Sequence, residues 1–261
     1  MKKFFAPLAL CLFLCLPLAA SAATPMEKGI ALAGGVEVPV SIYPATGDSV
    51  LLWLPSETGL VAAEREAAAT LAQQGLEVWL ADTLFARFLP ILASSLDKVP
   101  AEDVAQLIEA ARRDTGKSVY LVTAGRGAVP ALQGAAQWAG QNPQRRAVLA
   151  GAILLYPNLY VATPDPGEDA DYRPIASQTR LELFVLQGEL SPLYWRLDVL
   201  RNKLEQGGSR LTVKTLPGTR DRFYARESTS VPLPSEQAMA ARLPELIGDA
   251  WRDLKNRQGA K

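Results

Sequence analysis

Residues 119–132 read VYLVTAGRGAVPAL, and this stretch decides the fold class. An apolar run is followed by a turn of small residues around Arg126, and then by a segment typical of a helix start. The stretch therefore predicts a buried strand, a glycine turn and a helix in direct succession. Strands that alternate with helices in this way indicate one parallel sheet covered by helices.

The same alternation continues along the rest of the chain. We expect strands at 35–45, 48–55, 76–82, 118–124, 147–157, 181–188 and 210–218. We expect helices at 61–74, 100–116, about 130–139, 193–208 and 235–257, the last one bent at Pro244. The predicted class is α/β, with a single doubly wound, mostly parallel sheet and helices on both faces. The acidic, proline-rich segment 158–179 is too short for a cap domain and is expected to cover the carboxyl edge of the sheet.

The first 22 residues predict export. Lys2 and Lys3 precede an apolar run from residue 4 to 19, and small residues follow up to Ala22. This is the pattern of a bacterial secretory signal peptide, cleaved after Ala22, with a mature domain over 23–261 in the periplasm or outside the cell. The run of about 16 residues is shorter than the ~20 that span a bilayer, so a retained anchor is the weaker reading. A lipoprotein attached through Cys11 or Cys15 is a further alternative.

The composition excludes several kinds of site. The chain has no histidine, and its two cysteines both lie in the predicted signal peptide. A Ser-His-Asp triad is therefore impossible, and zinc, copper and haem sites are not expected. Oxygen ligands for calcium remain, but the acidic residues of 165–171 do not follow a known calcium loop, so no metal and no cofactor are expected. Without Lys2 and Lys3, 25 basic residues face 27 acidic ones, which gives no reason to expect nucleic acid or an anionic membrane as partner.

The order of the strands and the loops that follow them resembles the α/β-hydrolase fold superfamily. LLWLP, EVWLAD, YLVTAGRGA, GAILLYP, LFVLQGELSP and TLPGTRDRF carry the resemblance, which covers nearly the whole mature chain. In that superfamily the turn after the central strand, the nucleophile elbow, reads small-x-nucleophile-x-small. Here it reads Thr123-Ala124-Gly125-Arg126-Gly127, so the resemblance implies that Gly125 stands at the position of the nucleophile.

The other catalytic positions implied by the resemblance are also changed. Ser191 stands where the family's acid is usual, and Glu189 lies two residues earlier. Arg220, or Asp221 if the loop shifts by one residue, stands where the family has its histidine. The segment LPSETG at 54–59 replaces an oxyanion loop that usually begins His-Gly. The chain thus looks like a degenerate member of the superfamily that lacks the catalytic triad.

The resemblance also implies where a ligand would bind. The candidate binding residues are Ser56, Gly125, Arg126, Gly127, Arg220 and Asp221. Free backbone N–H groups at a helix start, together with arginine side chains, would suit a small anionic or polar ligand. Each residue also has a purely structural interpretation: the glycines permit a tight turn, Ser56 and Ser191 cap turns, and 220–222 form a solvated loop with an internal ion pair.

Carboxylates are the remaining chemical groups near these loops. Asp82 follows a strand and is expected to cap the next turn. Asp82, Asp97 and Glu57 could alternatively form a carboxylate pair for acid–base chemistry, which the sequence cannot bring together.

The sequence therefore favours an exported, non-catalytic protein, a pseudoenzyme, that binds a ligand or a protein partner through the former active-site cleft. Two alternatives stay open: a hydrolase of ester or acyl substrates with unconventional catalytic groups, and a structural subunit of an envelope complex. Whether the protein is an enzyme is left undecided, with the balance towards a binding role.

Overall fold

The computed structural model describes residues 24–165, 167–226 and 230–259. The predicted signal peptide lies outside these residues. The described chain forms one sheet of eight strands in the order β1-β2-β4-β3-β5-β6-β7-β8. The strands are β1 (Met26–Ala31), β2 (Glu37–Tyr43), β3 (Ser49–Trp53), β4 (Glu77–Ala81), β5 (Ser118–Ala124), β6 (Leu149–Leu155), β7 (Glu182–Gly188) and β8 (Arg210–Leu216).

The direction of the strands divides the sheet into two parts. Strands β3 to β8 pair in parallel, while β1 and β2 form an antiparallel hairpin that joins the sheet through β4. Strands β3 to β7 are almost completely buried, as their near-continuous apolar sequences predict. The single, mostly parallel sheet expected from the sequence is therefore confirmed.

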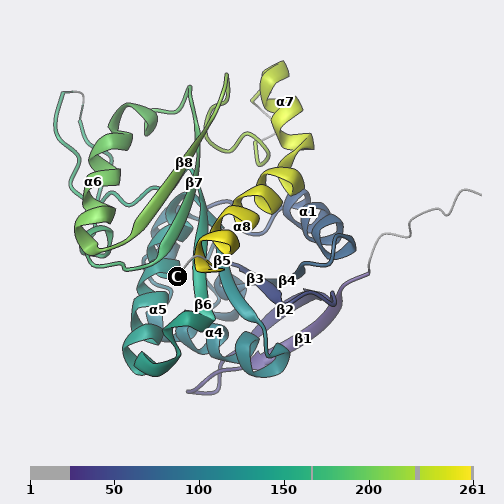
Figure 1. Ribbon diagram of the computed structural model, residues 1–261. Helices are drawn as coiled ribbons and strands as arrows, with labels where there is room; N and C mark the ends of the chain where they lie inside the picture. The colour runs from purple at the N-terminus through teal and green to yellow at the C-terminus, as the bar shows by residue number, and fades with distance from the viewer. Residues whose placement is uncertain (1–23, 166, 227–229, 260–261) are drawn as a thin grey trace, which may run out of the picture.

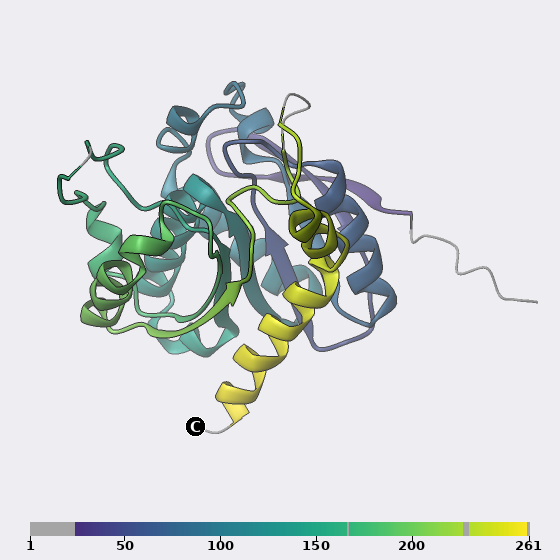
Figure 2. The ribbon, with the colours of Figure 1, turned by 90° about the horizontal axis from the view of Figure 1, so that it is seen from above.

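Helices cover both faces of the sheet (Figures 1 and 2). One apolar cluster lies between the sheet and α4, α5 and α6, and a second lies between the sheet and α1 and α8. The helices are α1 (Ala62–Gln73), α2 (Thr83–Ala86), α3 (Ala93–Leu96), α4 (Ala101–Thr115), α5 (Ala128–Gln141), α6 (Leu197–Gly207), α7 (Pro234–Ala241) and α8 (Leu243–Gly259). Within the described residues, no helix combines the length and apolar character needed to cross a membrane.

The structure differs from the sequence-based expectations at three places. The edge strand β1 and the short helices α2 and α3 were not expected. The predicted helix 235–257 bent at Pro244 is wrong, because α7 ends at Ala241 and a separate helix, α8, starts at Leu243. Proline is favoured in the first turn of a helix, where its missing N–H costs no hydrogen bond, so Pro244 marks a start and not a bend.

The parallel strands place their carboxyl ends at one edge of the sheet. The loops that follow β3, β4, β5, β7 and β8 all meet there, and they include every candidate site residue. The segment 158–179 contains a bridge between Tyr160 and Tyr172 and one short 3-10 helix, and it holds Arg126 from the same edge. The predicted site residues therefore lie at this edge of the sheet.

Candidate functional site

The elbow after β5 has the backbone that the family pattern requires. Gly125 has φ +52°, a left-handed conformation that side chains rarely adopt, and a single 3-10 turn over Gly125–Gly127 leads into α5. A β-carbon built at Gly125 would lie 2.3 Å from Glu57 Oε2. Real β-carbons do not approach an oxygen so closely, so glycine is the residue that fits while Glu57 holds this position.

Glu57 fills the space above the elbow. Its Oε2 accepts a hydrogen bond from the Arg126 backbone N–H at 2.9 Å, and its Oε1 pairs with Arg222 Nη2 at 3.2 Å. The side chain of Glu57 is only 11% exposed. The N–H of the residue after the nucleophile is the donor that forms the oxyanion hole of this fold. In this chain that donor already binds a carboxylate of the same protein.

The loop that carries Glu57 is held by its own hydrogen bonds. Ser56 and Gly59 exchange backbone hydrogen bonds, and the buried Ser56 hydroxyl pairs with Thr58 Oγ1 at 2.7 Å. The Ser56 oxygen also accepts from the Thr58 N–H. Ser56 thus closes the turn that aims Glu57 at the elbow, as its structural interpretation predicts.

Gly127 has an ordinary helical backbone, and glycine is needed there because neighbouring segments pack closely against it. A β-carbon there would lie 2.1 Å from Thr123 Oγ1 and 2.5 Å from the Pro55 carbonyl oxygen. The strand before the elbow and the loop after β3 therefore pack directly against the start of α5. A side chain at this position would push the three segments apart.

The Arg126 guanidinium is directed to the segment 158–179. Its Nη1 donates to the Tyr160 carbonyl at 3.0 Å, and its Nη2 pairs with Asp97 at 3.2 Å. Asp97 also pairs with Arg173 at 2.7 Å. Arg126 therefore offers its backbone N–H to Glu57 while its side chain joins the elbow to two neighbouring loops.

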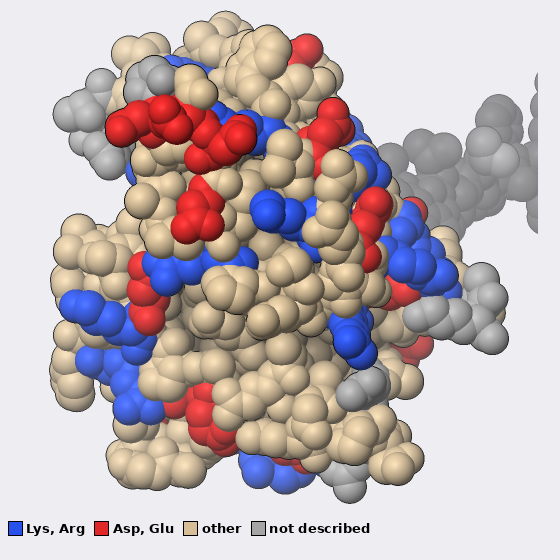
Figure 3. Space-filling model, turned by 90° about the vertical axis from the view of Figure 1, so that its left-hand side faces the viewer, with Lys and Arg blue, Asp and Glu red and all other residues tan. Residues whose placement is uncertain are grey.

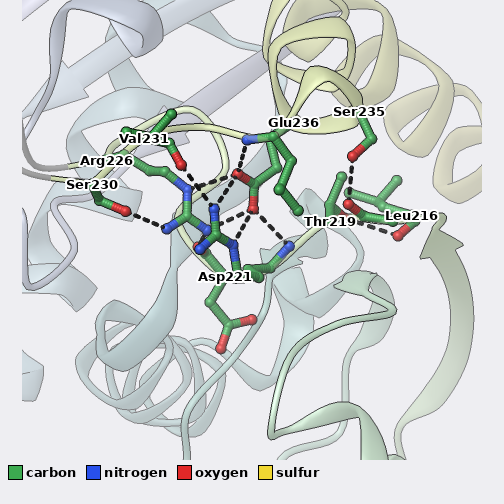
Figure 4. Close-up of polar contacts among 11 residues, drawn as sticks. Leu216, Thr219, Asp221, Arg226, Ser230, Val231, Ser235 and Glu236 are labelled. Carbon is green, nitrogen blue, oxygen red and sulfur yellow. Dashed lines mark hydrogen bonds and ion pairs between the residues drawn. The ribbon is translucent and has the colours of Figure 1, made fainter.

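Arg220 belongs to a separate ion-pair cluster around Glu236 at the start of α7. Figure 4 shows Glu236 and Arg226 of this cluster. The Nε and Nη2 of Arg220 bind the two carboxylate oxygens of the buried Glu236, each at 2.8 Å, and Arg226 binds the same carboxylate at 2.6 Å. The backbone N–H groups of Arg220 and Leu233 also donate to Glu236. The guanidinium of Arg220 holds the pKa of Glu236 well below its usual value.

Asp221 points away from that cluster, as Figure 4 shows. Its carboxylate hydrogen bonds with Ser191 and with Gln187 Nε2, the latter at 3.4 Å. Burial raises the pKa of Asp221, and the negative charge of Glu57 adds to the rise. Of the two residues considered for the histidine position, Asp221 is the one whose side chain faces the acid position Ser191.

The structure brings part of the predicted site together. Gly125 and the Arg126 backbone adjoin Glu57, and Asp221 lies near enough for the charge of Glu57 to raise its pKa. The Arg220 side chain is bound to Glu236. Asp82 accepts from the Phe85 N–H at 3.0 Å, so its expected capping role is confirmed, and it does not pair with Glu57 or Asp97. Among the described residues, no group of three or more Asp or Glu side chains is arranged to hold a metal ion.

The sequence does not predict two of these contacts. The place of Glu57 beside Ser56, in the loop after β3, is the one signal that points to the elbow, whereas the sequence pattern suggests only a pair with Asp82 or Asp97. Glu236 and Arg226 were missed because the tie to Arg220 spans the irregular segment before α7. Neither contact follows from spacing along the chain.

Behind the site lies a buried glutamate. Glu64 on α1 accepts from the Val61 N–H at 3.0 Å and from Tyr224 Oη at 3.0 Å. Burial raises the pKa of Glu64 to about 7. Tyr224 belongs to the loop after β8, so Glu64 ties α1 to the loop that also carries Asp221.

Comparisons with known proteins agree on the fold. A scan of protein-family models gave no match, and neither did a search of curated protein sequences. Among solved structures, the chain is similar to a bacterial brefeldin A esterase described as a homologue of human hormone-sensitive lipase, with a TM-score of 0.65, 14% identity, and coverage of 96% of this chain and 81% of that one.

Two further esterases give the same picture. Esterase 2 of Thermogutta terrifontis, phosphorylated by paraoxon, matches with a TM-score of 0.58 and 13% identity over 90% of this chain and 97% of that one. A hyperthermophilic esterase from the archaeon Pyrobaculum calidifontis matches with a TM-score of 0.60 and 13% identity over 86% of this chain and 83% of that one. Together with the strand order and the elbow, these likenesses establish that the protein has the α/β-hydrolase fold, with glycine at the apex of its elbow.

Proposed function

We propose that this protein is an exported, non-catalytic member of the α/β-hydrolase fold that acts by binding. The observation that carries the proposal is the Glu57 carboxylate above Gly125. The position of the nucleophile has no side chain, and the adjacent oxyanion donor is occupied by an internal carboxylate. Acyl transfer on this fold uses both groups, so their loss and replacement argue for a role without that chemistry.

The surface near the site favours a protein as the bound partner. Phe85, Phe88, Ile91 and Leu92 are all more than half exposed, and they follow one another closely after β4. The short helices of this segment, α2 and α3, lie at the outer rim of the molecule in Figure 2. Clustered exposed apolar side chains at the carboxyl edge are typical of an interaction surface. Because Glu57 fills the space above the elbow, this exposed apolar surface is the part of the carboxyl edge that a partner could contact.

The charges of the surface agree with this reading. On the face shown in Figure 3, basic and acidic side chains alternate around an uncharged area, with no extended patch of one sign. An extended basic patch is the feature that would argue for nucleic acid. We therefore keep a protein, or a small polar or anionic ligand, as the expected partner.

A carboxylate-based hydrolase is the second candidate, and one observation favours it. Glu57 pairs with Arg222 and accepts a hydrogen bond from the Arg126 backbone N–H, while burial raises the pKa of the nearby Asp221. Acid–base enzymes use carboxyl groups with a raised pKa close to a second carboxylate. This reading would give Glu57 the role of base and Asp221 the role of acid.

The test combines two measurements on the purified mature chain. We expect no mass increase after incubation with paraoxon, because no serine stands at the elbow. We expect hydrolysis of p-nitrophenyl acetate and butyrate at the rate of a heat-denatured sample. Hydrolysis above that rate, reduced by about 100-fold or more in Glu57→Gln or Asp221→Asn, would contradict the proposal and support the carboxylate hydrolase.

Export is tested separately by expressing the full chain in a bacterium with a periplasm. We expect the periplasmic fraction to contain a chain whose intact mass corresponds to residues 23–261. A variant with Ala20 and Ala22 both replaced by Asp should keep the longer mass, because cleavage needs small residues at these positions. Recovery of the uncleaved wild-type chain would contradict the export proposal and leave the binding proposal untouched.

A further inference from the structure

A cavity lies at the amino edge of the sheet, opposite the elbow. Its volume is about 780 Å³, and it is bordered by the first residues of β6, β7 and β8 and by the second half of α5. Pockets of roughly 300–1,000 Å³ are typical of small-molecule sites. Because the elbow follows the carboxyl end of β5, this cavity is a different site from the one built around Glu57.

The apolar wall of the cavity consists of small side chains. Ala135, Ala136, Ala139 and Gly140 of α5 contribute no bulk beyond a methyl group, and Leu149 and Leu181 lie beside them. A helix with larger residues at these positions would fill the space. The sequence of α5 therefore keeps an apolar recess open against the start of β6.

Among the described residues of the polar border, one cation has no ionic partner. Arg210 is bound by Glu182 through Nε at 2.8 Å and Nη2 at 2.6 Å. Arg180 is exposed at the same border, and it has no hydrogen bond or ion pair with any residue in the described part of the chain. Gln178, two residues away, is also exposed and lines the same cavity. The lining thus combines an apolar recess with an available guanidinium.

We propose that this cavity binds an amphipathic monoanion, a carboxylate with a short or medium acyl chain. The guanidinium of Arg180 would pair with the carboxylate, because its planar fork matches the two oxygens. The acyl chain would lie along the small residues of α5 and leave water. This site is independent of the proposed function, since it uses none of the residues near Gly125.

The probe is sodium octanoate, titrated into the mature protein by isothermal calorimetry, with 1-octanol and inorganic phosphate as comparison ligands. We expect saturable binding of one octanoate, much weaker binding of the alcohol and none of phosphate. Arg180→Gln should weaken octanoate binding by about tenfold or more, because a charge-assisted hydrogen bond is lost. The octanoate affinity of Arg180→Lys should lie between those of the wild type and Arg180→Gln, since lysine keeps the positive charge but lacks the planar guanidinium group.

Two further variants separate this site from general effects. Ala136→Phe places a bulky side chain at an exposed lining position of α5 and should abolish binding while the protein stays folded. Arg65→Gln, the same substitution at an exposed position on α1, should leave binding unchanged. Absence of saturable octanoate binding overturns the proposal. Equal affinity of wild type, Arg180→Gln and Ala136→Phe overturns it as well.

Discussion

At the scale of single residues, Gly125 and Glu57 are one unit. The glycine has a left-handed backbone, and the carboxylate occupies the space of any side chain that would replace its hydrogen. Both effects favour glycine at position 125. The left-handed backbone is set by the turn of the elbow, whereas the steric clash of a side chain depends on the presence of Glu57.

A double-mutant cycle separates these two restrictions. We expect Gly125→Ala to reduce the free energy of unfolding by about 3 kcal/mol, and by only about 1 kcal/mol in a Glu57→Ala background, where the backbone term alone remains. Urea denaturation measures both. Gly116→Ala is the matched control, because Gly116 has φ +70° and nothing within 4 Å of its would-be β-carbon. Equal costs of Gly125→Ala in both backgrounds would show that Glu57 does not occupy this place.

Glu64 predicts a pH dependence of stability. Its pKa is raised from 4.5 to about 7 in the folded protein, so its favourable contribution is complete below pH 4.5 and is lost as the pH rises through 7. The full loss is about 3 kcal/mol. We expect Glu64→Gln to lose less stability than the wild type between pH 4.5 and 8, measured by urea denaturation. The same pH profile for both proteins would exclude Glu64 as the titrating group.

At the scale of elements, the loop after β8 is fixed to α7 through Glu236. This buried carboxylate binds Arg220 and Arg226 at once, and Arg226 is the less exposed of the two arginines. The sequence offered no reason to connect 220 with 236, since the connection crosses an irregular segment. Contacts of this kind depend on the folded loop and cannot be predicted from periodicity.

Removing Arg226 tests this connection. We expect Arg226→Ala to reduce the free energy of unfolding by roughly 2–4 kcal/mol, because a buried carboxylate loses part of its compensation. The control is Arg252→Ala, which breaks an exposed pair with Asp249 on α8 and should cost less than about 1 kcal/mol. If the two variants lose the same stability, the cluster at Glu236 does not stabilise the fold.

The segment between β4 and α4 carries a strained residue that packing does not explain. Phe88 has φ +52° and is 93% exposed, so a bulky side chain takes an unfavourable backbone without burial in return. We expect Phe88→Asn to raise the free energy of unfolding by about 0.5–1 kcal/mol, because asparagine tolerates this backbone. A loss of stability, measured by thermal unfolding, would show that Phe88 contributes to the fold and not to an interaction surface.

At the scale of the whole molecule, the sheet could be predicted from the sequence. For the site, the sequence predicted its place at the edge of the sheet but not its contacts. The buried parallel strands have apolar sequences bounded by turns, and this local pattern is enough to predict strands β2 to β8 and the class of the fold. The strand β1 was not predicted because "MEKGIA" is mostly exposed at the edge of the sheet. The glycine at the elbow could be read directly from the sequence, whereas the position of Glu57 above it depends on the folded loop.

The fold also predicts which residues would restore chemistry. Of the two candidates for the histidine position, Asp221 faces Ser191 and Gln187, while Arg220 binds Glu236. We expect a variant with Glu57→Ala, Gly125→Ser, Ser191→Asp and Asp221→His to hydrolyse p-nitrophenyl acetate about 10- to 100-fold faster than the parent protein. It should also gain the mass of one diethylphosphoryl group after incubation with paraoxon.

The matched variant keeps the first three substitutions and carries Arg220→His in place of Asp221→His. It has the same types of catalytic residue, but its imidazole would replace a group that points to Glu236. We therefore expect neither hydrolysis above the parent nor phosphorylation. If the Arg220→His variant were the active one, the loop after β8 would have to turn by one residue, and the side-chain directions on which the site is built would be wrong. If only the Asp221→His variant reacts, the backbone at this edge of the sheet supports acyl-transfer chemistry once the catalytic side chains are supplied.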